Sequence, residues 1–336
     1  MSVTARSTPN SAWMKYWGNR NNALRLPMAD SFSMTLDSPT VEITLDHADV
    51  LSVRSFSPDG SEKELGTAHI QRFGKTLELI RQYLRTLGAG DALPASATIT
   101  VRSQIPSAVG LASSSAVFSC LARALQGLIL PTIELTDEQT SVLARLGSGS
   151  AARSIFGGFS ALLAGESDAI GSAYGRQYAD EHHWALHDII LVPSLQEKKI
   201  GSTEGHATAH TSPHYAARVQ AIRNWRQQEC IDAVLAKDFE KLQRVVEEDC
   251  IDMHHVMRTS TPPLDYLTED THRITRDITE LRRSEHLPVF YTMDAGPTVQ
   301  LLCTEEARDR VLAFARAQEG CALFETKTGP GACLIP

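Results

Sequence analysis

The sequence predicts an α+β fold divided between two domains. The chain has 336 residues, which is more than one hydrophobic core usually supports. Segments that alternate like strands are mixed with segments of helical periodicity, without strict alternation, and hairpin signals occur among them. This mixture favours α+β over a doubly wound parallel sheet. We place the boundary near residue 185, so the expected domains are 1–185 and 186–336.

Strands and helices of the first domain follow from apolar periodicity and from helix-end signals. Alternating apolar and polar residues, or a short apolar run between glycines, predict strands at residues 40–46, 96–103 and 157–165. Apolar residues at helical spacing run from Ile70 to Leu84, and Gly88 is expected to end that helix. A second helix is expected over about 113–128, and Thr136 with Gln139 forms a capping-box pattern that begins a third.

The second domain is expected to have longer helices and a hairpin. A buried strand is predicted at 189–192, and apolar stripes predict helices within 238–257 and 264–283. Two strand-like runs, 288–293 and 298–303, are joined by Asp-Ala-Gly-Pro, a turn signal. A helix from Thr304 and a strand at 321–326 complete the chain.

Composition excludes several classes of protein. Hydrophobic residues make up 42% and charged residues 21%, with a net charge of -8 and no basic block. Nucleic-acid binding needs clustered Lys and Arg, so we do not expect this protein to bind nucleic acid. The six cysteines are scattered, which indicates neither a zinc site nor a disulfide framework. Neither a signal peptide nor an apolar run of about 18 residues is evident, so a cytoplasmic enzyme without a membrane segment is expected.

A loop that leads into a helix, "PSAVGLASSSAVF" at 106–118, is suited to phosphate binding. Gly110 permits close backbone approach, and Ser113, Ser114 and Ser115 stand where the helix begins. Free N–H groups at a helix start attract anions, and serine hydroxyls can add donors or bind Mg²⁺. The Lys of a Walker A sequence is absent. An ordinary serine-capped helix is the alternative.

A second anion site is predicted in "LGSGSAARS", residues 146–154. Ser148, Gly149 and Ser150 precede helix-forming residues and Arg153. Backbone N–H groups and one guanidinium suit a carboxylate or a phosphate.

Two further segments are ambiguous when taken alone. In "KYWGNR", Lys15–Arg20, the aromatic residues are most simply core residues with the lysine outside. In "YTMDAGPT", Asp294 is most simply a turn residue whose carboxylate caps backbone N–H groups.

Together, and in this order, the four segments resemble the ATP-dependent mevalonate-type decarboxylases of the GHMP kinase superfamily. "PSAVGLASSSA" is similar to the superfamily's phosphate loop, while "NSAWMKYWGN", "GSGSAARSIFGGF" and "YTMDAGPT" resemble segments specific to the decarboxylases. The similarity extends from about residue 8 to 333. It implies an N-terminal domain with a ribosomal-protein-S5-like fold, a ferredoxin-like C-terminal domain, ATP and Mg²⁺ as cofactors, and a homodimer.

The resemblance also implies roles for individual residues. Asp294 would take or orient the proton of the substrate's 3-hydroxyl, Lys15 would keep that carboxylate ionised, and Arg153 would bind the C1 carboxylate. The implied ATP-binding residues are Gly110, Leu111, Ala112, Ser113, Ser114 and Ser115, with Ser113 or Ser114 on Mg²⁺. The implied binding residues for the phosphorylated mevalonate substrate are Tyr16, Asn19, Ser148, Gly149, Ser150 and Ser202.

One departure from the family pattern bears on the substrate. Relatives that use a diphosphate have Lys-Tyr-Trp-Gly-Lys, whereas this chain has Asn19 at the last position. The loss of that lysine removes a cation that would pair with the terminal phosphoryl group. In addition, this chain has Glu204 in a segment where bacterial relatives carry an Arg. Both differences favour mevalonate 5-phosphate as substrate and isopentenyl phosphate as product. Arg20 could compensate for Asn19, and the diphosphate substrate is the alternative. A 3-hydroxyl kinase and an inactive binding protein rank lower because the Lys, Arg and Asp are all present.

Overall fold

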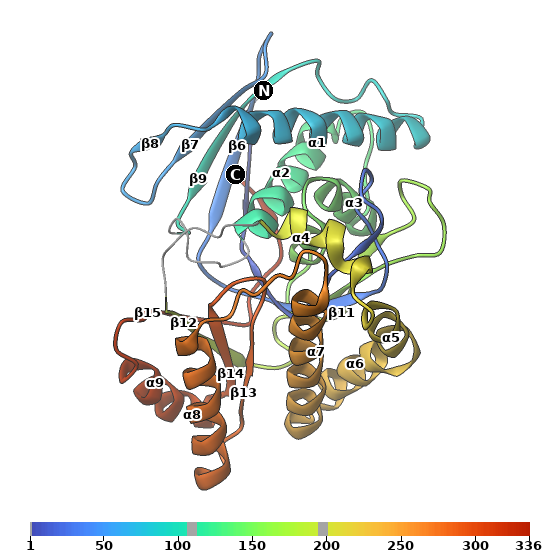
Figure 1. The fold of residues 1–336 in the computed structure, drawn as a ribbon. Coiled ribbons are helices and arrows are strands. Elements are labelled where there is room, and N and C mark those ends of the chain that lie inside the picture. Colours follow the sequence, from blue (N-terminus) through green and yellow to red (C-terminus); the bar gives the residue numbers. More distant parts are fainter. Residues whose placement is uncertain (1, 106–112, 194–200) are drawn as a thin grey trace.

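The computed structural model describes residues 2–105, 113–193 and 201–336, apart from the side chains of 202–204. It has the predicted mixed architecture, with an N-terminal part above a C-terminal part in the view of Figure 1. The described helices are α1 (Thr67–Thr86), α2 (Ser113–Ile129), α3 (Asp137–Gly147), α4 (Ser202–Thr208), α5 (Tyr215–Ala221), α6 (Gln227–Ala236), α7 (Phe239–Thr259), α8 (Glu269–Glu285) and α9 (Arg308–Arg316). In the described residues, no helix is long and apolar enough to cross a bilayer.

The N-terminal part contains two sheets. One has the order β16-β1-β6-β9-β7-β8, formed by β16 (Cys333–Ile335), β1 (Val3–Ser7), β6 (Val41–His47), β9 (Ala97–Ser103), β7 (Ser52–Phe56) and β8 (Glu62–Lys63). The other has the order β11-β10-β5-β2, formed by β11 (Tyr174–Ala179), β10 (Phe159–Leu163), β5 (Ser31–Thr35) and β2 (Asn10–Met14). A short ribbon pairs β3 (Asn19–Asn21) with β4 (Leu26–Pro27). Helix α2 packs on β1 and β6, and α3 packs on α2.

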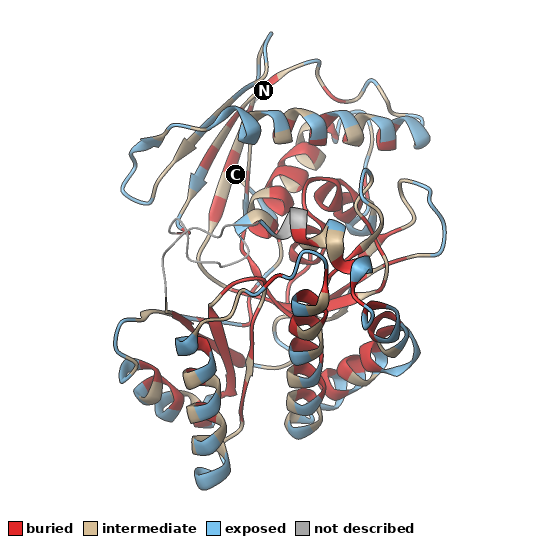
Figure 2. Cartoon of the chain, in the orientation of Figure 1, coloured by how far each residue is buried: buried red, intermediate tan, exposed pale blue. Residues whose placement is uncertain are grey.

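The C-terminal part is built on an antiparallel sheet of order β13-β14-β12-β15. Its strands are β13 (Val289–Thr292), β14 (Val299–Thr304), β12 (Leu186–Val192) and β15 (Ala322–Lys327). Ile189 and Leu301 on one face pack with residues of α8 and α9, which are exposed on their outer sides in Figure 2. Leu186 and Ile190 on the other face join the core of the N-terminal part. One core therefore extends across both parts, while the face of this sheet under α8 and α9 has a separate core.

The helix-end signals act as the sequence predicts. Thr136 and Gln139 form a complete capping box at the start of α3, and Gly88 follows α1 with a positive φ of 73°, a conformation that glycine adopts without a steric penalty. The turn between β13 and β14 begins at Asp294, as its Asp-Ala-Gly-Pro signal indicates. The expected strands and helices are confirmed.

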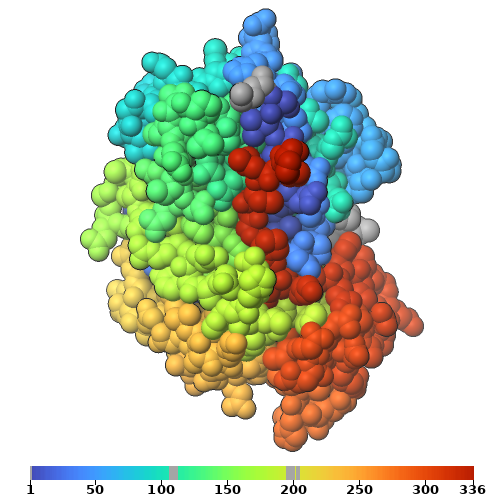
Figure 3. Space-filling model, turned by 180° about the vertical axis from the view of Figure 1, so that it is seen from behind, coloured from blue at the N-terminus to red at the C-terminus, as the bar shows by residue number. Residues whose placement is uncertain are grey.

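Two features differ from the expectations. The segment Gly149–Ile155 is a short 3₁₀ helix rather than the start of a regular α-helix. The last strand, β16, returns from the C-terminal part and pairs antiparallel with β1; Figure 3 shows this final segment, in red, lying along the blue N-terminal strands. The boundary near residue 185 stays a prediction, and the last residues of the chain contribute to the N-terminal sheet.

Candidate functional site

Two adjoining cavities lie where the segment Lys15–Arg20, the start of α2, α4 and the Asp294 turn meet. The first has a volume of about 210 Å³ and is lined by Asn10, Ala12, Lys15, Tyr16, Trp17, Ser113, Ser114, Ser150, Arg153, His206, Met253, Asp294 and Ala295. The second has a volume of about 230 Å³ and is lined by Tyr16, Asn19, Asn22, Arg25, Arg72, Ser114, Ser148, Gly149, Ser150, His206 and Ala207. Four residues line both, so the cavities form one site with two ends.

Lys15 and Asp294 form an ion pair at the first end. The Lys15 Nζ donates to Asp294 Oδ1 at 2.7 Å and to the Ala12 carbonyl at 2.6 Å. The lysine side chain is 2% exposed, whereas the aspartate is 30% exposed. The ammonium is therefore held behind the carboxylate, which faces the cavity. The expectation that Lys15 lies outside is wrong, because two acceptors hold its ammonium inside.

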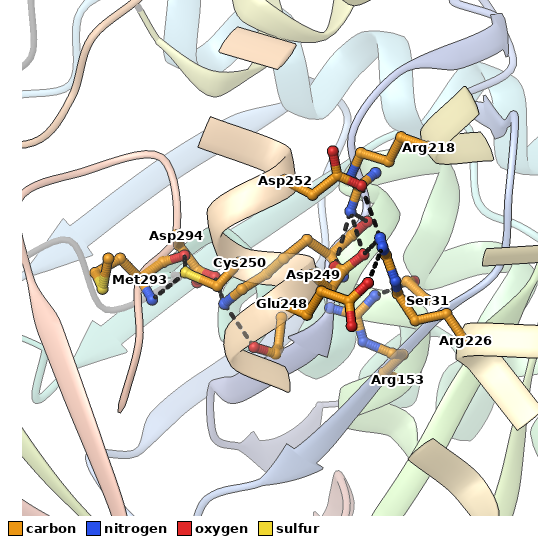
Figure 4. Close-up of polar contacts among 12 residues, drawn as sticks. Ser31, Arg153, Arg218, Arg226, Glu248, Asp249, Cys250, Asp252, Met293 and Asp294 are labelled. Atoms are coloured by element: carbon orange, nitrogen blue, oxygen red, sulfur yellow. Dashed lines mark hydrogen bonds and ion pairs between the residues drawn. The ribbon is translucent and has the colours of Figure 1, made fainter. Parts of the chain in front are cut away.

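Helix α7 holds both members of this pair through the backbone. Asp249 Oδ2 accepts the Lys15 N–H at 2.8 Å, and the Cys250 Sγ accepts the Met293 N–H at 3.2 Å, next to Asp294. Figure 4 shows Asp249 and Cys250 on one helix, with Met293 and Asp294 on the neighbouring segment. Adjacent residues of α7 thus fix the two segments that carry the ion pair.

Asp249 is the centre of a buried charge network. Arg218 donates to both of its oxygens at 2.9 and 2.8 Å, and also to the Lys15 carbonyl at 3.2 Å. Arg226 donates to Asp249 at 3.2 Å and to Asp252 at 2.7 Å. Because each buried charge has partners, the network stays stable, and removing one member would leave another uncompensated.

Arg153 is brought to the same cavity by the 3₁₀ helix. Its guanidinium donates to Ser33 Oγ at 2.9 Å, to Ser31 Oγ at 2.5 Å and to Asn10 Oδ1 at 3.0 Å. These partners are neutral. Burial lowers the pKa of Arg153 to about 10, opposed by Asp294, so the group stays cationic at neutral pH. A buried cation with no carboxylate bonded to it is suited to an anionic ligand.

The second end of the site contains the other predicted substrate residues. Ser148, Gly149 and Ser150 line it with Tyr16 and Asn19. A Cβ on Gly149 would lie 2.3 Å from the Tyr16 ring, so only glycine permits this approach. The Tyr16 hydroxyl donates to Asn19 Oδ1, and burial raises the pKa of Tyr16 to about 12. Position 19 therefore contributes a neutral amide to this cavity.

Two arginines here were not predicted from the sequence. Arg25 Nε donates to the Leu146 carbonyl at 3.1 Å, and Arg72 donates to the Gly147 carbonyl at 2.9 Å. Burial lowers the pKa of Arg25, and it lowers that of Arg72 to about 10. Neither has a carboxylate partner among the described residues. No periodicity or motif marked them, although the φ of 50° at Arg25 is a strained conformation of the kind that gathers at functional sites.

The start of α2 borders both ends of the site. Ser113 and Ser114 line the first cavity, and Ser114 Oγ lies 3.1 Å from Ser148 Oγ. Ser115 differs from the expectation, because the helical turn places its side chain in the buried face of α2. The predicted residues Gly110, Leu111 and Ala112, and the side chains of Ser202 and Glu204, lie outside the described residues.

Arg20 does not compensate for Asn19. Its guanidinium donates to the carbonyls of Pro27 at 2.6 Å, Ala164 at 2.8 Å and Ser167 at 2.6 Å. It lines neither cavity. Arg20 thereby ties the ribbon of β3 and β4 to the segment after β10.

Comparison with known proteins gives consistent matches along the chain. Residues 7–173 match the model of the diphosphomevalonate decarboxylase-like N-terminal domain, and residues 188–322 match that of the mevalonate 5-diphosphate decarboxylase C-terminal domain. The diphosphomevalonate decarboxylase of Rattus norvegicus is 32% identical, over 94% of this chain and 80% of the relative. The human protein of the same name is 31% identical, over 91% of this chain and 77% of the relative.

Solved structures agree with these matches. The mevalonate diphosphate decarboxylase of Staphylococcus aureus has a TM-score of 0.86 and 28% identity, covering 100% of this chain and 98% of that one. A structure described as MDDEF in complex with MVAPP, AMPPCP and magnesium has a TM-score of 0.85 and 27% identity, covering 100% and 99%.

Proposed function

The chain belongs to the diphosphomevalonate decarboxylase family, and from that premise we propose that it converts mevalonate 5-diphosphate to isopentenyl diphosphate, with ATP, releasing ADP, phosphate and CO₂. The observation that carries the choice of a diphosphate is the pair Arg25 and Arg72 at the second end of the site. Two guanidiniums that bond only to carbonyls, in a cavity whose described lining has no carboxylate, suit a multiply charged phosphate. The substrate names of the relatives and the magnesium complex point the same way.

The first end of the site supplies the proton acceptor. Lys15 bonds to one oxygen of Asp294, and among the described residues the other oxygen is available to the 3-hydroxyl of the substrate. Asp294 accepts the hydroxyl proton, so that the hydroxyl oxygen can attack the terminal phosphoryl group of ATP. Because Lys15 is almost fully buried, its ammonium is held 2.7 Å from the Asp294 carboxylate and keeps that carboxylate in position beside the cavity.

Arg153 holds the other reacting group. Its buried guanidinium fixes the C1 carboxylate, so that the C1–C2 bond is held in one orientation relative to C3. When the phosphorylated oxygen leaves C3, the electrons of the C1–C2 bond form the C2=C3 double bond and CO₂ departs. Positioning and electrostatic stabilisation account for most of what the protein contributes to such a step.

The residues at the start of α2 fit ATP and Mg²⁺. Ser113 and Ser114 present hydroxyls to the first cavity beside a 17-residue helix, and helix starts and hydroxyls suit phosphate oxygens and Mg²⁺ respectively. ATP supplies the phosphoryl group that turns the 3-hydroxyl into a leaving group. The homodimer stays a prediction.

Mevalonate 5-phosphate is the second candidate substrate. Asn19 stands where the family pattern has a lysine, and the structure bonds its amide to Tyr16 and Asn22. The second cavity thereby lacks one cation that relatives with that lysine would bring to the distal phosphoryl group. If Arg25 and Arg72 do not replace that charge, the monophosphate would be favoured.

The decisive experiment compares mevalonate, its 5-phosphate and its 5-diphosphate, with ADP and CO₂ measured together. We expect the diphosphate to have the highest kcat/KM. A preference of about 100-fold for the monophosphate, equal to about 2.7 kcal/mol, would assign the second function. ADP release without CO₂ would instead indicate a kinase.

Matched variants test the role of the arginines. Arg72→Gln and Arg25→Gln should each raise KM for the diphosphate by about tenfold or more, the value of one charge-assisted hydrogen bond, and by less for the monophosphate. Arg85→Gln, an exposed position on the same helix as Arg72, is the control. Equal losses for both substrates would mean that the arginines do not bind the distal phosphoryl group.

A further inference from the structure

His206 is a polar residue shared by the two ends of the site. It lies on α4 and lines both cavities. Its ring centroid is 4.3 Å from that of Tyr16 and 4.6 Å from that of Trp17. A Cβ on Gly205 would lie 2.6 Å from the Trp17 indole, so glycine allows α4 to pack closely here. The ring plane is therefore fixed by contacts on its faces.

The hydrogen bond at Nδ1 defines the tautomer of this histidine. The backbone N–H of Gly18 donates to Nδ1 at 2.9 Å, so Nδ1 carries a lone pair and no proton. Gly18 has a φ of 92°, the region that favours glycine, and this conformation accompanies the bond to the ring. A neutral imidazole with an acceptor at Nδ1 must carry its proton on Nε2.

Several groups near the ring keep it uncharged. Burial and the neighbouring Arg25 lower the pKa of His206 to about 3. In the described part of the chain, Nε2 has no hydrogen-bond partner, whereas Nδ1 does. A fixed neutral N–H with no acceptor among the described residues thus lies between the reacting end of the site and the phosphate end.

We propose that the Nε2–H of His206 donates a hydrogen bond to the phosphoryl group attached to the substrate's C5 oxygen. This inference rests on the proposed function, which places the C1 carboxylate at Arg153 and the distal phosphate at Arg25 and Arg72. The phosphoryl group nearest the carbon chain then lies between them, beside His206. The bond would fix the distance between the reacting carbon and the phosphate end without adding another positive charge.

A pair of variants separates the two ring nitrogens. In His206→Asn the amide oxygen can replace Nδ1 as the acceptor for Gly18, but the donor at Nε2 is lost. In His206→Gln the longer side chain can place an N–H near Nε2. We expect the Asn variant to raise KM for mevalonate 5-diphosphate by about tenfold or more, the value of a hydrogen bond to a charged group. The Gln variant should recover most of that loss, and kcat should change little.

Other outcomes would overturn the inference. A normal KM in the Asn variant with a raised KM in the Gln variant would show that the ring serves only to hold Gly18. An equal increase of KM in both variants would show that packing of the ring, and not its N–H, matters for binding. A second readout is the ¹⁵N NMR signal of His206 Nε2, which should move on binding substrate without ATP; an unmoved signal would also overturn it. Wild-type turnover of the diphosphate is measured first, so failure of the proposed function is distinguished from failure of this contact.

Discussion

Asp188→Asn should change how stability depends on pH. Asp188 lies in β12 and is fully buried, and neither of its carboxyl oxygens has a hydrogen-bond partner among the described residues. Burial raises its pKa from 3.8 to about 7, although Ser11 and Lys15 oppose the shift. Removing a proton from this site therefore costs free energy that the unfolded chain does not have to supply.

The sign and size of the effect follow from the two pKa values. The unfolded chain releases this proton near pH 4, whereas the folded protein keeps it until about pH 7, so the wild type loses stability as the pH rises between these values. The difference from 3.8 to about 7 is about 3 pH units, which corresponds to about 4 kcal/mol at 1.36 kcal/mol per unit. Asparagine cannot ionise, so the variant avoids this loss.

Urea unfolding of both proteins at pH 4, 6 and 8, followed by tryptophan fluorescence and circular dichroism, measures the effect. The quantity to compare is the free energy of unfolding of the variant minus that of the wild type. This difference should increase by about 4 kcal/mol between pH 4 and pH 8 and should not increase further above pH 8. Burial also lowers the pKa of His206 to about 3 and that of His254 to about 4; these shifts raise stability as the pH rises to about 6.5, but they occur in both proteins and cancel. A difference that does not vary with pH would refute the reasoning.

Three further variants test the site. Asp294→Asn should lower kcat by about 10³-fold or more and leave the protein folded, with a lower melting temperature because the buried Lys15 ammonium loses its counter-charge; an active variant would contradict the assignment of the base. Asp249→Asn should lower the free energy of unfolding by about 3–5 kcal/mol, because Arg218 loses its buried counter-charge, and thermal unfolding at unchanged temperature would rule this out. Gly149→Ala should raise KM for the phosphorylated substrate, because the added methyl group would displace the Tyr16 ring. Steady-state kinetics measures this KM, and an unaltered KM would contradict the prediction.

The reacting residues could be found in the sequence only when several segments were taken together. Lys15 and Asp294 are 279 residues apart, and each has an ordinary structural explanation in its own segment. The order of four segments was informative because the family resemblance joined them. The structure then brings Lys15, Arg153 and Asp294 to one cavity, as that resemblance implies.

Other parts of the site had no local signal. Arg25 and Arg72 reach the second cavity because carbonyls at the end of α3 hold their guanidiniums, and this contact joins three distant segments. The role of Asp249 was likewise not predictable from its own segment. Helical periodicity explains why it is buried, but not why it accepts a hydrogen bond from the distant Lys15 N–H. Tertiary contacts of this kind cannot be obtained from spacing along one helix or loop.

The distribution of charge in the site bears most directly on the choice of substrate. The chain carries a net charge of -8, yet the described residues that line its cavities include four cations and one carboxylate. Lys15 is neutralised by Asp294, and Arg153 is expected to meet the C1 carboxylate. Two guanidiniums, Arg25 and Arg72, then remain for the phosphate end, where Asn19 adds no charge. Among the residues that the structure describes, discrimination between one and two phosphoryl groups therefore depends on these two arginines. It depends on whether both can turn their remaining N–H groups toward the distal phosphate while their carbonyl bonds persist.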